Sequence, residues 1–214
     1  TSRKPRAART TPVSTDVPRR TPKSSRWTGG WYRSARRVDS PNFGPRPAEA
    51  VIDLVVVHSI SLPPGEYGTG DIERLFTNTL DWDAHPYFNT IRGIQVSSHF
   101  VIARSGTITQ FVDCDQRAWH AGGSHYRGRD NCNDDSIGIE LEGLEGESFF
   151  EAQYTALTSL CRDLDQRYCI RFIAGHEHVA PDRKRDPGPG FEWQKLRNKL
   201  CDLGWWFPLP ASNR

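Results

Sequence analysis

Residues 51–58 read Val-Ile-Asp-Leu-Val-Val-Val-His, a nearly continuous and mostly β-branched apolar run that ends in a histidine. A run of this kind is typical of a strand that is buried on both of its faces. His58 would then stand at the carboxyl end of a central strand. Ligands and catalytic groups of open α/β sheets gather at that edge, so His58 is a candidate functional residue.

The segments that follow alternate between strand and helix patterns. The Ser105-Gly106 turn predicts a hairpin of strands 97–103 and 107–112, and residues 136–142 alternate between apolar and polar as a strand does. A capping-box pair, Ser148 and Glu151, predicts the start of the clearest helix. Further elements are expected as a strand at 171–175 and helices at 71–80 and 191–202. The fold class is therefore α/β, a single domain with a central mixed β-sheet flanked by helices.

Three parts are expected along the 214 residues: a disordered basic extension over 1–30, one folded domain over 31–204 and a C-terminal tail over 205–214. Residues 1–26 hold eight basic side chains and one acid, a local charge of +7. The remainder holds 20 basic and 25 acidic side chains, a net charge of −5. An acidic domain argues against nucleic acid as the partner.

Composition also indicates the cellular compartment in which the protein is expected. No run of about 18 apolar residues exists, so we expect no membrane span, and the start of the chain lacks the apolar stretch of a secretory signal. The five cysteines are an odd set without CxxC spacing: Cys114, Cys132, Cys161, Cys169 and Cys201. We interpret them as reduced thiols of a cytoplasmic protein, and a compact zinc site built from cysteines is not expected.

A second histidine, His176, closes the last predicted strand as His58 closes the central one. Two histidines at strand ends favour a shared metal site, because neutral imidazole is the commonest metal ligand. The segment after His176 offers three candidates for a third ligand: His178, Asp182 and Asp186. His178 shares a face with His176 if the strand continues, and Asp186 lies in a loop stiffened by prolines. Two histidines and a carboxylate would leave a position for water, as in a catalytic zinc site.

A site that activates water also needs a proton carrier. Glu140 and Glu142 lie on the polar face of the predicted strand at 136–142, and either fits this role. A carboxylate on a core strand carries a desolvation cost, which disfavours a purely structural origin. Lys184, two residues before Asp186, would place a positive charge near the metal, although taken alone it is more simply a solvated loop lysine.

Several longer motifs occur together between about Trp31 and Leu200: Val55-Val-Val-His-Ser-Ile-Ser-Leu-Pro-Pro-Gly65, Ala84-His-Pro-Tyr-Phe88, Arg117-Ala-Trp-His-Ala-Gly122, Cys132-Asn-Asp134, Ser136-Ile-Gly-Ile-Glu-Leu-Glu-Gly143, Gly175-His176 and Asp186-Pro-Gly-Pro189. In this combination the chain resembles the zinc-dependent N-acetylmuramoyl-L-alanine amidases. The resemblance implies a cytoplasmic enzyme of peptidoglycan recycling. It would hydrolyse the amide between the lactyl group of (1,6-anhydro-)N-acetylmuramic acid and L-alanine of the stem peptide. The partner would be this small muropeptide, without nucleic acid or membrane, and we expect a monomer.

The resemblance also implies roles for individual residues. It assigns the ligands of one Zn²⁺ per chain as His58, His176 and Asp186. Glu140 becomes the general base and acid, Lys184 the residue that stabilises the oxyanion, and Glu142 a structural residue. Two alternatives are a general amidase acting on wall peptidoglycan and a non-catalytic muropeptide-binding module.

The chain departs from the family pattern at three positions, where Ser59 stands for Asn, and Gln95 and Asn131 stand for Arg. The zinc chemistry is expected to survive these changes. Recognition of the anhydro sugar and of the stem peptide is less defined, because a neutral amide does not reproduce the two-point pairing of Arg with a carboxylate. Candidate substrate-binding residues are Ser59, Tyr87, Gln95, His99, Trp119, His120, Arg129 and Asn131.

Overall fold

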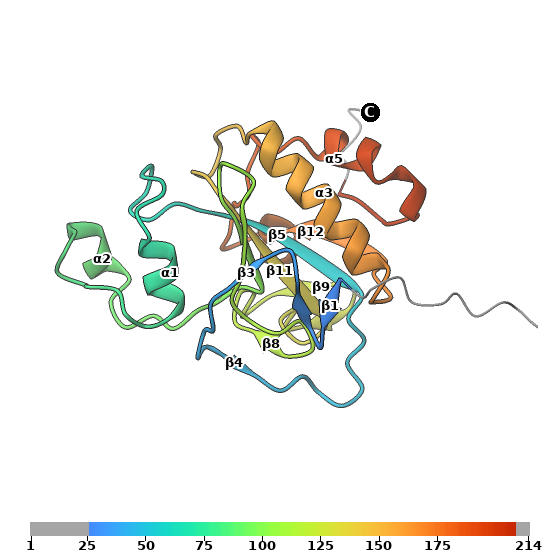
Figure 1. Ribbon diagram of the computed structural model, residues 1–214, viewed down its shortest axis with the longest axis horizontal. Helices are drawn as coiled ribbons and strands as arrows, with labels where there is room; N and C mark the ends of the chain where they lie inside the picture. The colour runs from blue at the N-terminus through green and yellow to red at the C-terminus, as the bar shows by residue number, and fades with distance from the viewer. Residues whose placement is uncertain (1–25, 209–214) are drawn as a thin grey trace, which may run out of the picture.

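A computed structural model describes residues 26–208. Its centre is a six-stranded sheet in the order β12-β5-β11-β6-β7-β3. The two long strands, β5 (Leu54–Ile60) and β11 (Ser136–Glu142), lie side by side in the middle of this sheet (Figure 1). The other four strands are β3 (Arg36–Arg37), β6 (Phe100–Ile102), β7 (Ile108–Gln110) and β12 (Phe172–Gly175).

The sheet is mixed, which confirms the predicted class. β12 and β11 both run parallel to β5, and β6 runs parallel to β11. β7 is antiparallel to β6 and parallel to β3, so the predicted hairpin around Ser105-Gly106 is present. The carboxyl ends of β12, β5 and β11 therefore meet at one edge of the sheet.

Helix α3 (Glu151–Asp165) covers one face of the sheet (Figure 1). Its buried leucines pack in one cluster with Val55 and Val57 of β5 and with Ile137, Ile139 and Leu141 of β11. The alternate residues of β5, Leu54 and Val56, pack on the opposite face with Ala121, Cys132 and Val179. The central strand is thus buried on both faces, as its composition predicts.

The start of α3 differs from the expected capping box of Ser148 and Glu151. The helix begins at Glu151, and Phe150 is its N-cap residue. The Gln153 side chain accepts a hydrogen bond from the Phe150 N–H at 3.1 Å. Phe149, just before the cap, is buried against Phe191, and this packing fixes where the helix begins.

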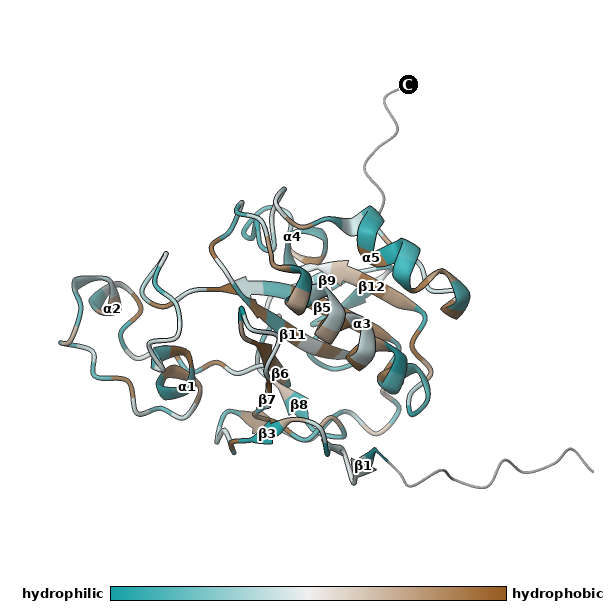
Figure 2. Ribbon diagram, turned by 45° about the horizontal axis from the view of Figure 1, so that its top comes forward, coloured by the Kyte–Doolittle hydropathy of each residue, from teal (hydrophilic) through white to brown (hydrophobic). Residues whose placement is uncertain are grey.

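Two short helices, α1 (Asp71–Phe76) and α2 (Pro86–Thr90), form an arm beside the sheet (Figure 2). The predicted helix at 71–80 stops early, because Asn78 adopts a left-handed conformation with φ of 59°. α2 was not predicted. His85 caps it by accepting the Tyr87 N–H at 3.1 Å, and Pro86 occupies the first turn, where proline is favoured.

The remaining helices follow β12. α4 (His176–Val179) begins directly after the strand, and α5 (Trp193–Lys199) is followed by a 3₁₀ turn, η1 (Cys201–Leu203). The predicted helix at 191–202 is therefore split in two. No helix within residues 26–208 is long and apolar enough to cross a membrane.

The folded part extends beyond the expected boundaries at residues 31 and 204. Trp27 is buried, and β1 (Trp27–Thr28) pairs with β2 (Trp31–Tyr32). At the other end, the Trp206 N–H bonds the Arg171 carbonyl at 2.8 Å, which ties this segment to β12. Two further small sheets are formed by β4 (Phe43–Gly44) with β8 (Arg117–Ala118) and by β9 (His125–Tyr126) with β10 (Arg129–Asp130). The expected extension up to residue 25 and the tail from residue 209 lie outside the described residues.

Candidate active site

The carboxyl ends of three neighbouring strands bring together side chains that are distant in the sequence. In the parallel pairing of β11 with β5, Glu140 lies opposite His58. β12 ends at Gly175, which pairs with Val57, so His176 follows at the same level as His58. Glu140, His58 and His176 therefore share one edge of the sheet.

His58, His176 and Asp186 form a compact triangle of potential ligand atoms. His58 Nδ1 lies 3.0 Å from His176 Nδ1, and Asp186 Oδ2 lies 3.2 Å from each of these nitrogens. Bonds of about 2.0–2.1 Å to a tetrahedral Zn²⁺ would separate the ligand atoms by about 3.3 Å. The edges of the triangle are close to this spacing, so these three residues fit a zinc ion.

The protonation states of two members of the triangle, His176 and Asp186, also suit a cation. Burial lowers the pKa of His176 to about 4, and the neighbouring His58 contributes to this shift. Burial would raise the pKa of Asp186, but the adjacent His176 and His58 rings hold it well below its usual range. An ionised carboxylate and a neutral imidazole both present lone pairs to a metal.

The two other candidates for a third ligand lie elsewhere. β12 ends before His178, and the chain turns into α4, so the continued strand that would align His178 with His176 does not form. His178 Nδ1 instead accepts the Gly175 N–H at 2.9 Å, and its ring packs against Trp193. Asp182 is exposed in the loop after α4.

Glu140 is a carboxyl group with an unusual pKa. Burial raises the pKa of Glu140 to about 7; Asp186 adds to this shift, while His58 and Lys184 oppose it. Its Oε2 atom is buried and has no hydrogen-bond partner among residues 26–208. A carboxyl with a pKa near 7 can both accept and return a proton at neutral pH.

Glu142 has a different place, although periodicity alone does not separate it from Glu140. It is buried, and its carboxylate accepts the Gly68 N–H at 2.6 Å and the Arg104 N–H at 3.2 Å. These bonds attach the loop before α1 and the β6–β7 hairpin to the end of β11. Glu142 therefore holds two loops in position.

A cleft of about 350 Å³ opens over the triangle and Glu140. Lys184 lines it, and the lysine side chain makes no hydrogen bond or ion pair within the described part of the chain. Ser59 Oγ and His176 Nε2 are buried in its wall without partners among residues 26–208. Buried polar atoms are normally paired, so these orphaned atoms point to an occupant of the cleft.

Apolar residues line the cleft as well, and they come from the end of β5 and the loop after it, from α1 and from the segment after α2. They are Ile60, Leu62, Leu75, Phe76, Ile91, Ile94 and Val96. Sequence reasoning did not assign these residues to the site, because their apolar spacing looks like that of ordinary core positions. In the structure, Ile94 is 44% exposed, and an exposed large apolar side chain indicates a binding surface better than a core position does.

Of the eight candidate substrate-binding residues, four line the cleft: Ser59, Tyr87, Trp119 and His120. Gln95 is exposed between two lining residues, Ile94 and Val96, without lining the cleft itself.

The other three candidates, His99, Arg129 and Asn131, do not line the cleft. His99 is fully buried. Its Nδ1 accepts the Gly138 N–H at 3.0 Å, and its Nε2 lies 3.1 Å from the Gln116 carbonyl. Arg129 forms ion pairs with Asp53 at 2.9 Å and Asp135 at 2.8 Å.

Asn131, the third of them, belongs to a turn. It adopts a left-handed φ of 54°, and its side chain bonds Asp134 at 3.3 Å. Asparagine tolerates this backbone conformation better than arginine, which gives the residue a local structural reason.

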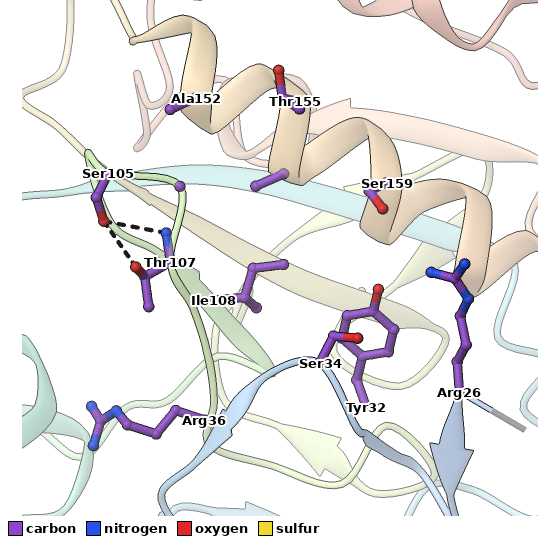
Figure 3. A pocket seen from close by; sticks show the side chains of 12 residues that line it. Arg26, Tyr32, Ser34, Arg36, Ser105, Thr107, Ile108, Ala152, Thr155 and Ser159 are labelled. Atoms are coloured by element: carbon purple, nitrogen blue, oxygen red, sulfur yellow. Dashed lines mark hydrogen bonds between the residues drawn. The ribbon is translucent and has the colours of Figure 1, made fainter.

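A larger hollow of about 590 Å³ lies between the turn at residues 105–107 and α3 (Figure 3). Among the described residues, no acid, histidine or cysteine lines it. Its two arginines are already engaged, Arg26 with Asp163 and Arg36 with Glu73. This hollow lacks the groups for catalysis, so the smaller cleft at the strand ends is the candidate active site.

Comparison with known proteins agrees with this geometry. Residues 48–189 match the family described as N-acetylmuramoyl-L-alanine amidase. The chain belongs to this family. The amidase is 50% identical over 170 residues to 1,6-anhydro-N-acetylmuramyl-L-alanine amidase AmpD of Escherichia coli K12, covering 78% of this chain and 93% of that protein. The AmpD of Salmonella typhimurium SL1344 is 51% identical, with 78% and 91% covered.

Solved structures give the same result. A crystal structure of a selenomethionine AmpD derivative superposes on the amidase with a TM-score of 0.78 and 50% identity, covering 80% of this chain and 97% of that one. The amidase AmiD of E. coli, solved with the substrate anhydro-N-acetylmuramic acid-L-Ala-D-γ-Glu-L-Lys, is 32% identical with a TM-score of 0.54. The match covers 79% of this chain and 64% of AmiD.

Proposed function

We propose that this chain is a zinc-dependent amidase that cleaves the amide between the lactyl group of 1,6-anhydro-N-acetylmuramic acid and L-alanine of the stem peptide, in peptidoglycan recycling. The observation that carries the proposal is the His58–His176–Asp186 triangle beneath a cleft that also contains Glu140 and Lys184. A zinc ion with three protein ligands keeps a position open, lowers the pKa of a bound water toward about 7 and polarises a carbonyl.

Glu140 is proposed as the proton carrier of the reaction. Its place opposite His58 puts the carboxyl beside the triangle, and its pKa of about 7 suits both directions of transfer. Glu140 takes the proton of the attacking water as the water adds to the carbonyl carbon. It then delivers this proton to the alanine nitrogen as the C–N bond breaks.

Lys184 is proposed to stabilise the negative charge that develops on the carbonyl oxygen. Its ammonium group lines the cleft, and it has no carboxylate partner among the described residues that would neutralise it. A fixed positive charge at a developing oxyanion acts mainly in the transition state, so its contribution appears in the rate of the chemical step.

The cleft also suits an amphiphilic muropeptide. Its lining combines polar and charged side chains with apolar ones, so a sugar-peptide can place its different groups against each kind. The substrate bound in the AmiD structure is of this class, and the name of the AmpD relatives specifies the same kind of molecule. Gln95, between the lining residues Ile94 and Val96, offers this substrate a neutral amide and no positive charge. Preference for the anhydro sugar is therefore measured directly in the experiment below.

We place the reaction in the cytoplasm. Support comes from the cysteines: all five are free, and Cys114, Cys132 and Cys161 are buried. A reducing compartment keeps such thiols unpaired.

One substrate comparison tests the proposal. The zinc-loaded chain is incubated with anhydro-N-acetylmuramic acid-L-Ala-D-γ-Glu-L-Lys and, separately, with intact peptidoglycan sacculi, and the products are identified by mass spectrometry. We expect release of the free tripeptide from the small substrate and little release from sacculi. Faster cleavage of sacculi would instead indicate a wall amidase. Binding of the muropeptide without any hydrolysis would indicate a recognition module.

A further inference from the structure

A chain of buried hydrogen bonds runs away from the triangle into the body of the protein. His58 Nε2, the ring nitrogen that faces away from Asp186, lies 2.9 Å from His120 Nδ1. His120 Nε2 lies 3.2 Å from Ser136 Oγ. Ser136 Oγ in turn bonds the backbone carbonyl of Cys132. His58 and Ser136 are almost completely buried and His120 is 9% exposed, so water has little access to these bonds.

The carbonyl at the far end sets the direction of every bond in this chain. A carbonyl oxygen carries no proton, so the Ser136 hydroxyl must donate its single proton to Cys132. Ser136 Oγ is then an acceptor toward His120, which places the His120 proton on Nε2. In a neutral ring, His120 Nδ1 is left with a lone pair and accepts the Nε2–H of His58.

The last bond determines which nitrogen of His58 faces a metal. With its proton on Nε2, a neutral His58 has a lone pair on Nδ1, and Nδ1 is the atom that belongs to the triangle with His176 and Asp186. A ligand histidine usually donates its other ring N–H to a neighbouring group, and this donation fixes the ring and its tautomer. Here the neighbouring group is a second histidine, whose own tautomer is fixed in the same way.

The surroundings of His120 are built around this position. Gly138 lies on the same face of β11 as Ser136 and Glu140, and a β-carbon there would come within 2.5 Å of the His120 ring. The backbone of His120 is held as well. Asn133 Oδ1 accepts the N–H groups of His120 at 3.0 Å and of Ala121 at 2.7 Å. Both the ring and its backbone are therefore fixed independently of the bond to His58.

We propose that His120 and Ser136 are positioning residues that fix the tautomer of His58 and so prepare Nδ1 for the cation, with the Cys132 carbonyl as the anchor. This inference rests on the zinc site proposed above. It gives two segments of the sequence, Cys132-Asn-Asp134 and Ser136-Ile-Gly138, a role beyond packing.

The first test reads the tautomer directly. Nitrogen-15 NMR of the histidine rings in the zinc-loaded full chain, assigned by comparison with His120→Gln, reports which ring nitrogen carries the proton. We expect His120 to carry it on Nε2, with Nδ1 unprotonated. A proton on Nδ1 of His120 would overturn the proposal; the signal is read on the parent chain, and the variant serves only to assign it.

The second test measures zinc affinity by competition with a chromophoric chelator. Ser136→Ala removes the acceptor of the His120 proton, and we expect it to weaken zinc binding about tenfold, at the lower end of the effect of outer partners of metal ligands. The matched control is Ser98→Ala, which removes another fully buried serine hydroxyl, bonded to the Phe100 carbonyl at 2.7 Å. We expect the control to bind zinc within about twofold of the parent.

The outcomes separate the inference from the zinc proposal. If the parent chain binds no zinc, the zinc site itself is wrong. If the parent binds zinc and the Ser136→Ala and Ser98→Ala variants bind it equally well, the zinc site is supported, and the positioning role of His120 and Ser136 is wrong. A fold lost in Ser136→Ala would show in its circular dichroism, and the NMR measurement on the parent then decides.

Discussion

Glu140 and His58 occupy paired positions on adjacent parallel strands, so the sheet itself sets the spacing between the proton carrier and the first metal ligand. Neither side chain depends on a loop for its position. A substitution at Glu140 that keeps its size should therefore change the chemistry and leave the metal site in place.

Glu140→Gln is the first prediction. The amide has nearly the same shape but cannot accept the proton of water, and we expect kcat to fall at least about 100-fold while zinc content is unchanged. Steady-state kinetics and metal analysis of the same preparation check both parts. Glu142→Gln is the comparison on the same strand: because Glu142 holds the loops at Gly68 and Arg104, its loss should lower the melting temperature more than kcat. Activity of Glu140→Gln within tenfold of the parent would remove Glu140 from the mechanism.

Lys184→Met tests the stabilisation of the oxyanion. The apolar side chain fills similar space without the charge, and we expect kcat to fall about 100- to 1000-fold with little change in KM. Lys195→Met is the matched control, since Lys195 pairs with Glu151 and Glu192 on the surface. A loss confined to KM would show that Lys184 binds the substrate and does not act on the transition state.

Asp186→Asn tests the third ligand. Zinc that binds only the folded chain stabilises it by mass action, by about 4 kcal/mol when free zinc is 1,000 times its dissociation constant. We therefore expect zinc to raise the melting temperature of the parent by several degrees and to have little effect on Asp186→Asn. Calorimetry with and without a chelator measures this difference. His178→Asn, which leaves the triangle intact, should respond to zinc as the parent does.

Much of this site was predictable because it lies on regular structure. The β-branched run places His58 at the end of a strand, and the alternation places Glu140 and Glu142 on the polar face of another strand without choosing between them. The third ligand was not predictable in this way: whether His178 or Asp186 faces His176 depends on the chain turning into α4 directly after β12, and no helix was predicted at that point. The resemblance to the family assigned Asp186, and the triangle places it beside the two histidines.

The substrate cleft was harder to predict than the metal site. Its apolar lining comes from the end of β5, from α1 and from the segment after α2, and the spacing of these residues does not distinguish a cleft from a core. Conversely, His99 and Arg129 carry functional side chains that the fold uses internally, one in a hydrogen-bonded core position and one in ion pairs. Side-chain type alone therefore does not separate residues that line the cleft from residues that the fold uses internally.

Leu157→Ala tests the packing of α3. Leu157 is fully buried against the sheet, and truncation of such a side chain costs about 2–5 kcal/mol of folding free energy. We expect a lower midpoint in urea unfolding and an unchanged kcat/KM at temperatures where the variant remains folded. A changed kcat/KM in the folded variant would mean that α3 packing reaches the cleft.

The two faces of β11 contact different parts of the protein. Ile137, Ile139 and Leu141 lie against α3, whereas Ser136, Gly138 and Glu140 lie toward His120 and the cleft. The effects of random substitutions along this strand should therefore depend on whether the residue number is odd or even. Within residues 136–141, odd-numbered positions would yield poorly accumulating proteins of normal specific activity, and even-numbered ones abundant proteins of low activity; Glu142, which holds two loops, falls outside this pattern. Over residues 136–141, an engineer who wishes to stabilise the enzyme or to retune its chemistry can read from residue number alone which positions to vary.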